Sequence, residues 1–184
     1  MARLKAICAV AHPDDCVIFA RPFIKKYADF DWHIVYLTYH NTDDRAREVA
    51  AFWDKQGIST EFLGFVDHYT DNETGKFNFW KSVDAQAQIV RAVDAADIIL
   101  THNIDGDYGH IHHILVARSV ASTGKPMVNF AGQHQVDSTN CITVNEDLNL
   151  DLLPLHKDVI EQFQNINTGC YQISESVWDI LNQM

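Results

Sequence analysis

Two short clusters of histidine and carboxylate side chains have the composition of a metal site. The first is the run His12–Asp15 (His-Pro-Asp-Asp), which directly follows an apolar segment, and the second contains His110 and His113. These two histidines are three residues apart, so on a helical turn they project to the same side. Imidazole nitrogen and carboxylate oxygen are ordinary ligands of zinc or iron. Two histidines and one carboxylate would supply the three protein ligands of a catalytic zinc site.

The same residues also have a simpler interpretation, as a turn followed by a helix. Proline fixes the backbone of a turn, and aspartate commonly caps the helix that follows. A lone surface histidine is usually only solvated. However, four of the ten histidines fall within Thr101–His113. This concentration of titratable groups favours a functional site.

A second metal chemistry uses the carboxylates of the same segment. Asp105 and Asp107 could join the cluster in a magnesium- or manganese-dependent phosphohydrolase. The nitrogen-rich ligand set and the lack of a glycine-rich phosphate loop argue against this class.

Apolar runs alternate with amphipathic stretches along most of the chain. This order predicts an α/β fold of Rossmann-like type, with a mostly parallel sheet covered by helices on both faces, as a single domain over residues 1–184. The expected strands are Leu4–Ala11, Trp32–Tyr39, Thr60–Phe65, Asp97–His102, Pro126–Phe130 and Cys141–Val144. The expected helices are Pro22–Ala28, one capped by Asn41 or Thr42, one capped by Ser82, Ile111–Ser122, Asp151–Phe163 and Ser174–Leu181.

The predicted fold brings the two clusters together. In a doubly wound sheet the first and fourth strands lie side by side, and ligands bind beyond the carboxyl ends of the strands. The residues after Ala11 and after His102 should therefore face each other across one crevice. The polar segment Asp67–Lys81 is the expected place for an insertion or lid. Substrate selection is expected to depend on this loop and on Gly132–Asn140.

Composition narrows the class of partner. The chain has 184 residues, of which 47% are hydrophobic and 21% charged, as in an ordinary globular protein. Its formal net charge of −11 repels nucleic acid and anionic membranes. No apolar run approaches the roughly 20 residues that span a bilayer, and the N-terminal apolar run is too short for a signal peptide. The four cysteines form no C-x-x-C pair, so we expect reduced thiols and a cytoplasmic location. A homo-oligomer is compatible with these properties.

The two motifs, in this order and position, resemble the PIG-L/LmbE-like deacetylase family of the N-acetylglucosaminyl de-N-acetylase type. The resemblance covers about Leu4–Ser122 and implies a Rossmann-like fold. It also implies metal-dependent removal of the N-acetyl or N-acyl group from an amino sugar, carried by a small-molecule or glycoconjugate substrate. The expected substrate is an N-acetylglucosamine derivative. The implied metal is Zn²⁺, with Fe²⁺ as the alternative. Carried over by motif, the metal ligands are His12, Asp15 and His113, the catalytic base is Asp14, and the assisting side chains are His110 and Tyr108.

The resemblance also suggests a substrate contact and shows departures. An arginine on the helix after the second strand contacts substrate in relatives, and Arg47 is the residue assigned here, with a solvated helix face as the alternative. The family motif usually continues His-Pro-Asp-Asp-Glu, whereas Cys16 follows here. The second motif often has a carboxylate where this chain has His112. These departures concern substrate and rate, since they remove neither a ligand nor the base.

The residues permit amide hydrolysis. Asp14 would take a proton from water and return it to the leaving amine. A protonated His110 would stabilise the oxyanion, and Tyr108 would donate a further hydrogen bond. His112 is expected to support a ligand. Two other functions remain open, namely amide hydrolysis of a non-sugar substrate and metal-retaining sugar binding without catalysis.

Overall fold

The structure is a computed structural model of the whole chain, in which residues 3–67, 82–131, 140–144, 152–163 and 169–183 are described. Most of the predicted lid, most of Gly132–Asn140 and the start of the helix expected at Asp151 lie outside these ranges. Within them, no helix is long and apolar enough to cross a membrane.

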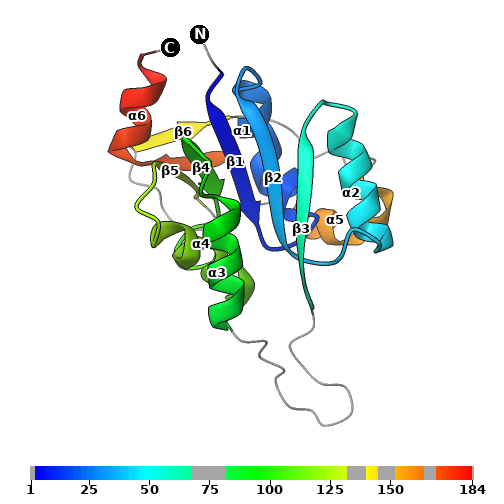
Figure 1. The fold of residues 1–184 in the computed structure, drawn as a ribbon. Helices are drawn as coiled ribbons and strands as arrows, with labels where there is room; N and C mark the ends of the chain where they lie inside the picture. Colours follow the sequence, from blue (N-terminus) through cyan, green and yellow to red (C-terminus); the bar gives the residue numbers. More distant parts are fainter. Residues whose placement is uncertain (1–2, 68–81, 132–139, 145–151, 164–168, 184) are drawn as a thin grey trace.

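A seven-stranded sheet forms the centre of the molecule (Figure 1). Its strand order is β3-β2-β1-β4-β5-β7-β6. The strands from β3 to β5 in this order are parallel, whereas β7 is antiparallel to both β5 and β6. The strands are β1 (Lys5–Val10), β2 (Asp31–Thr38), β3 (Ser59–Phe65), β4 (Ile98–Thr101), β5 (Met127–Phe130), β6 (Cys141–Thr143) and β7 (Cys170–Ile173). The predicted α/β class with a mostly parallel sheet is confirmed.

Helices cover both faces of this sheet (Figure 1). The helical elements are η1 (Cys16–Ala20), α1 (Arg21–Lys26), α2 (Asp44–Asp54), α3 (Ser82–Ala92), α4 (Ile111–Ala121), η4 (Pro154–His156), α5 (Lys157–Gln162) and α6 (Glu175–Leu181). One core joins the sheet to η1, α1, α2, α5 and α6, and the other joins its opposite face to α3 and α4.

Strand β1 shows why its sequence is apolar throughout. Ala6, Cys8 and Val10 enter one core, whereas Ile7 and Ala9 enter the other. Successive side chains of a strand point to opposite faces, so a strand covered on both faces needs apolar residues at every position. Because β1 is packed on both faces, its position is fixed, and so is the position of the residues that directly follow it, Ala11 and His12.

Several local expectations needed adjustment. Helix α2 begins at Asp44 with Asp43 as its N-cap, one or two residues later than the caps predicted at Asn41 or Thr42. Pro22 lies in the first turn of α1, as predicted. In the described part of the expected Asp151–Phe163 helix, a 3₁₀ turn (η4) precedes the short α5. Strand β7 was not predicted, because four residues of alternating burial give too short a pattern to distinguish it from a loop.

Candidate metal centre and active site

The two histidine clusters meet at the carboxyl ends of β1 and β4. These strands pair in parallel, with Ala9 opposite Thr101. Just beyond the strands, the backbone N–H of Ala11 donates to Nε2 of His102 at 3.0 Å. The predicted adjacency of the first and fourth strands is therefore confirmed, and it brings together motifs about a hundred residues apart in the sequence.

His12, Asp15 and His113 form a triangle of potential ligand atoms. Nδ1 of His12 lies 3.2 Å from Oδ2 of Asp15 and 3.3 Å from Nε2 of His113. The third side, from Nε2 of His113 to Oδ2 of Asp15, is 3.4 Å. All three residues are buried. The structure thus brings together the three residues assigned as ligands by motif.

The dimensions of this triangle fit a small metal ion. Ligand atoms held about 2.0–2.1 Å from a tetrahedral zinc are separated from one another by about 3.3 Å. The chemistry of the set, with two imidazole nitrogens and one carboxylate oxygen, suits zinc or iron. Both the distances and the donor types are therefore compatible with a three-ligand site.

A carboxylate holds the far nitrogen of each histidine in the triangle. Nδ1 of His113 lies 2.8 Å from Oδ2 of Asp107, and Nε2 of His12 lies 3.1 Å from Oδ1 of Asp67. A nitrogen that donates to a carboxylate carries the proton, so the other ring nitrogen keeps its lone pair. Each imidazole is thus oriented with its lone pair toward the triangle, as in carboxylate–histidine–metal arrangements.

The negative charge around His12 favours a cation at the triangle. Burial opposes the charged imidazole, but contacts with Asp15 and Asp67 outweigh it and raise the pKa of His12 to about 10. The same negative charge that stabilises a proton would stabilise a metal ion in its place.

His102 is part of the network and is an unsuitable ligand. Its Nδ1 lies 2.5 Å from Oδ2 of Asp107, and its Nε2 accepts the Ala11 N–H. Both ring nitrogens are therefore used, although Nε2 lies 3.4 Å from Oδ2 of Asp15. Asp107 accordingly acts as a hydrogen-bond acceptor for two histidines, and the exposed Asp105 does not join the triangle.

Asp14 lies beside the triangle in a buried position. Its Oδ1 accepts a hydrogen bond from Nη2 of Arg45 at 3.2 Å. Burial and the neighbouring charge of Asp15 raise the pKa of Asp14, although His12 and Arg45 oppose this shift. A raised pKa brings a carboxylate closer to the range in which it exchanges protons near neutral pH.

His110 and Tyr108 border the triangle from the loop before α4. The ring centroid of His110 lies 4.7 Å from that of His12 and 4.6 Å from that of His113. Tyr108 is 44% exposed, and its ring centroid lies 5.2 Å from that of His113. Both side chains therefore stand where a substrate bound at the triangle would meet them.

The expected positive charge on His110 needs correction. Burial and the positive charge of His113 and His12 lower its pKa to about 3. A divalent cation at the triangle would disfavour the charged form further. His110 is therefore neutral near pH 7, and it can donate a hydrogen bond only through the N–H of one tautomer.

His112 contacts a member of the triangle. Its Nδ1 lies 3.1 Å from Nε2 of His12 and 3.8 Å from Oδ1 of Asp67. This position agrees with the expectation that His112 supports a ligand.

Arg47 lies away from these groups. Its side chain is largely exposed and pairs with Asp44, in agreement with the alternative of a solvated helix face. Arg45, on the inner side of α2, contacts Asp14 and also donates to the Tyr39 hydroxyl at 2.8 Å. The structure thus brings Arg45 into the site in place of the arginine assigned by resemblance.

The loop before α4 has an unusual backbone. Gly106, Asp107 and Gly109 all have positive φ. A Cβ atom on Gly106 would lie 2.6 Å from the carbonyl oxygen of His110, so a side chain cannot be accommodated there. The φ of +64° at Asp107 is uncommon for a residue other than glycine, although aspartate tolerates it better than most. This conformation places the Asp107 carboxylate between two histidines.

Cys16 is a core residue at the start of the buried turn η1. Its sulfur accepts hydrogen bonds from the Tyr36 hydroxyl at 2.8 Å and from Nε1 of Trp53 at 3.0 Å. Burial raises the pKa of Cys16 to about 12 despite these two bonds. The thiol is therefore protonated, and it links the buried side chains of Tyr36 and Trp53.

A pair of contacting side chains, the partly buried Glu48 and the buried His156, lies on the side of Arg45 and Asp14. Oε2 of Glu48 is 2.8 Å from Nδ1 of His156. Burial lowers the pKa of His156; Arg45 lowers it further, whereas Glu48 and Asp14 raise it. Because His156 is fully buried, this pair holds η4 against α2.

The sequence interpretation did not assign site positions to Arg45, Asp67, His102 and His156. Arg45 lies four residues before the buried Val49 and so shares the apolar face of α2, a signal that could have favoured Arg45 over Arg47. His102 is the first residue after β4, where ligands are expected. Asp67 and His156 had no local signal, since only tertiary contacts bring them near the site.

Comparisons with known proteins place this geometry in context. A deacetylase of the teicoplanin biosynthesis pathway shares the fold, with 13% sequence identity and a TM-score of 0.55 over 87% of this chain and 84% of that chain. The zinc-inhibited form of teicoplanin deacetylase Orf2 has 12% identity and a TM-score of 0.53 over 87% of this chain and 84% of that chain. The 4-carboxy-2-hydroxymuconate hydratase GalB of Pseudomonas putida KT2440 has 15% identity and a TM-score of 0.54 over 98% of this chain and 84% of that chain. At these identities the likeness concerns the fold alone. A search of curated proteins found no match.

The family itself is shown by the sequence. Residues 7–123, well over half of the chain, match the family described as PIG-L, GlcNAc-PI de-N-acetylase. The matched segment contains the triangle, Asp14 and the loop of Tyr108 and His110. With its fold, its buried histidine–carboxylate triangle and this match, the chain belongs to the PIG-L de-N-acetylase family.

Proposed function

We propose that the chain is a metal-dependent hydrolase that removes the N-acetyl group from an amino sugar, specifically an N-acetylglucosamine derivative. The observation that carries the proposal is the buried triangle with sides of 3.2, 3.3 and 3.4 Å, next to a buried carboxylate of raised pKa. Family membership adds the class of reaction. We further propose that residues 1–184 act as one domain, because strands from Lys5 to Ile173 share one sheet.

The proposed ligands are His12, Asp15 and His113. A bound divalent metal supplies Lewis acidity, which lowers the pKa of water and polarises an amide carbonyl. Asp107 and Asp67 contact the far nitrogens of the two imidazoles, so that the other nitrogens would be free to hold a metal. We propose Zn²⁺ with Fe²⁺ as the alternative.

The proposed base is Asp14. Its carboxylate takes a proton from the attacking water and then delivers it to the amine nitrogen as the C–N bond breaks. Arg45 holds one oxygen of Asp14, which leaves the other for this transfer. The raised pKa of Asp14 suits both steps, since the group must accept a proton and then release it.

Neutral His110 and Tyr108 are proposed to stabilise the oxyanion. Each offers one hydrogen-bond donor, an imidazole N–H and a phenolic O–H. The role of His110 thus becomes that of a neutral donor.

Acetate release tests this function. The purified chain is incubated with a panel of N-acetylated amino sugars and with N-acetylated amino acids and amines as non-sugar amides. Reactions contain Zn²⁺ or Fe²⁺ at increasing ratios to protein, or a chelator. The metal titration includes low ratios because one structural neighbour was solved in a zinc-inhibited form.

Acetate release from the amino sugars, lost with the chelator and in Asp14→Asn, is the expected result. Release only from the non-sugar amides would assign a different substrate class. Sugar binding without any acetate release would indicate a non-catalytic relative.

A further inference from the structure

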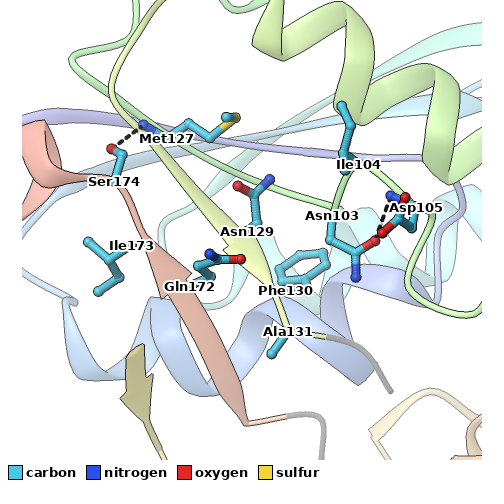
Figure 2. Close-up of a pocket in the computed structure, with 10 residues that line it drawn as sticks. All are labelled: Asn103, Ile104, Asp105, Met127, Asn129, Phe130, Ala131, Gln172, Ile173 and Ser174. Atoms are coloured by element: carbon cyan, nitrogen blue, oxygen red, sulfur yellow. Dashed lines mark hydrogen bonds between the residues drawn. The ribbon is translucent and has the colours of Figure 1, made fainter. Parts of the chain in front are cut away.

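A cavity of about 460 Å³ opens beside the loop that follows β4. It lies between this loop and the two strands β5 and β7 (Figure 2). Its volume is within the usual range for small-molecule sites. The residues that line it are Asn103, Ile104, Asp105, Met127, Asn129, Phe130, Ala131, Gln172, Ile173 and Ser174.

Three amide side chains surround this cavity, with Asn129 between Asn103 and Gln172 (Figure 2). The strand register explains part of the arrangement, because Asn129 of β5 is paired with Gln172 of β7. Paired residues point to the same face of a sheet, so their side chains are neighbours.

Hydrogen bonds to the backbone fix two of the amides. Nδ2 of Asn129 donates to the carbonyl oxygen of His102 at 2.6 Å, so its Oδ1 remains as an acceptor. Oδ1 of Asn103 accepts the N–H groups of Asp105 and Asp107 at 3.0 and 2.9 Å, so its Nδ2 remains as a donor. The cavity therefore presents a fixed donor and a fixed acceptor, and Gln172 offers one of each.

The charge of the lining indicates what it would bind. Asp105 is its one charged residue, and no lysine, arginine or histidine is present among the ten lining residues. A phosphate or carboxylate would find no cationic partner there. Apolar surface comes from Ile104 and Met127. A neutral sugar ring has matching chemistry, since its hydroxyls both donate and accept and its C–H face is apolar.

The cavity shares its loop with the metal triangle. Asn103 and Asp105 line the cavity, and Asp107, two residues later, holds His113 of the triangle. On the other side, Asn129 is bonded to the carbonyl of His102, whose ring reaches Asp15. The segment 102–107 therefore contributes residues both to the cavity and to the network around the triangle.

From this arrangement we propose that the cavity is a second sugar subsite, which holds a neutral sugar unit next to the unit that is deacylated. The proposal rests on the proposed function for its placement in catalysis. It assigns the enzyme a substrate of two or more sugar units, with recognition of the second unit by Asn103, Asn129 and Gln172.

The test compares N-acetylglucosamine with its β-linked disaccharide in the wild type, in Gln172→Ala and in Gln172→Trp. Gln172 is exposed on β7 and has no part in the metal triangle, so neither change should disturb the basal chemistry. The alanine removes the amide, and the indole fills the cavity. Gln56→Ala is the matched control, because Gln56 is another exposed glutamine that does not line the cavity.

We expect Gln172→Ala to weaken disaccharide binding about 3- to 10-fold, the effect of one hydrogen bond. Gln172→Trp should weaken it at least as much. Binding of the monosaccharide, and kcat for both sugars, should stay within about twofold of wild type. Binding is measured by calorimetry on the metal-loaded protein, and thermal unfolding checks that each variant is folded.

Calorimetry separates failure of this proposal from failure of the proposed function. If no acetate is released but disaccharide binding is selectively lost in Gln172→Trp, the subsite stands and the catalytic assignment fails. Equal weakening of both sugars, unchanged disaccharide binding in both Gln172 variants, or no disaccharide binding by the wild type would overturn the subsite.

Discussion

Two regions of the molecule differ in how many of their polar groups already have partners. One is the corner formed by His12, Asp15, His113 and the side chains that contact them. The other is the cavity lined by the amides of Asn103, Asn129 and Gln172. In the corner, both nitrogens of His102 and the far nitrogens of His12 and His113 have partners. In the cavity, Asn103 and Asn129 each use one half of the amide internally and leave the other half open.

This difference suits the corner to catalysis and the cavity to substrate recognition. Chemistry needs ligand atoms held rigidly, which buried and fully paired groups provide. Recognition needs open donors and acceptors whose orientation is already fixed. Substitutions in the corner should therefore change metal binding or kcat, whereas those in the cavity should change only the affinity for part of the substrate.

The largest effect is expected from His113→Ala. Removing one of three ligands should abolish stoichiometric metal binding and lower turnover about a thousandfold or more. Metal analysis and acetate release measure both. His33→Ala, a histidine near the start of β2 and remote from the corner, is the control. Full metal content in His113→Ala would show that the triangle is not the metal site.

Asp14→Asn should separate metal binding from catalysis. Asparagine keeps the shape but cannot accept the proton, so kcat should fall about 10²- to 10⁴-fold with little change in KM. Metal content and fold should be retained. Near-normal turnover would mean that Asp14 is only structural, and loss of metal would mean that Asp14 and Asp15 have exchanged roles. The exposed Asp44→Asn is the control.

Asp107→Asn tests whether pairing of the far nitrogen matters. Oδ2 of Asp107 accepts hydrogen bonds from a ring nitrogen of both His102 and His113. The neutral amide of asparagine lacks the negative charge of this carboxylate. We expect metal affinity to fall about 10- to 100-fold, measured by competition with a chelator. Asp105→Asn removes a carboxylate from the same loop and should leave affinity unchanged. Equal metal affinities in Asp107→Asn and Asp105→Asn would show that the carboxylate paired with His113 is no more important for metal binding than one that lines the cavity.

Two arginines of one helix sharpen the assignment of the base. Arg45→Met removes the donor to Asp14 and should lower kcat about 10-fold, because the carboxylate loses its fixed orientation. Arg47→Met, on the exposed side of α2, should stay within about twofold. Steady-state kinetics on both variants measure the difference. A larger effect from Arg47 would restore the assignment made by resemblance.

The smallest effect concerns pH and His156. Burial lowers the pKa of His156 in the folded state, so the unfolded chain takes up a proton near pH 6.5 that the folded chain does not. The resulting stability is present above this pH and is lost as the pH falls through the folded-state pKa. His156→Gln should therefore lose less stability than wild type between pH 7.5 and 5.

Urea unfolding of both metal-free proteins at these two pH values measures the difference. It is limited to one proton, or about 1.4 kcal/mol per pH unit. Parallel pH dependence in the two proteins would show that His156 does not titrate differently on folding.

The sequence by itself determined the parallel part of the fold and the two motifs. Apolar runs such as Lys5–Val10 are local signals, because a strand buried on both faces needs apolar side chains throughout. The spacing of His110 and His113 is local as well. Because ligands bind beyond the carboxyl ends of parallel strands, the sequence was enough to predict that His12 and His113 lie close together.

Only the tertiary structure decided which groups support these motifs. The antiparallel strand β7, the pairing of Glu48 with His156 and the approach of Asp67 to His12 all join segments far apart in the chain. The protonation of His110 depends on burial and on charges from other segments. Sequence spacing determines which side chains share a face of one element. Contacts between elements depend instead on strand register and packing. Those contacts determine the histidine tautomers, the pKa values and the fact that Arg45, not Arg47, contacts Asp14.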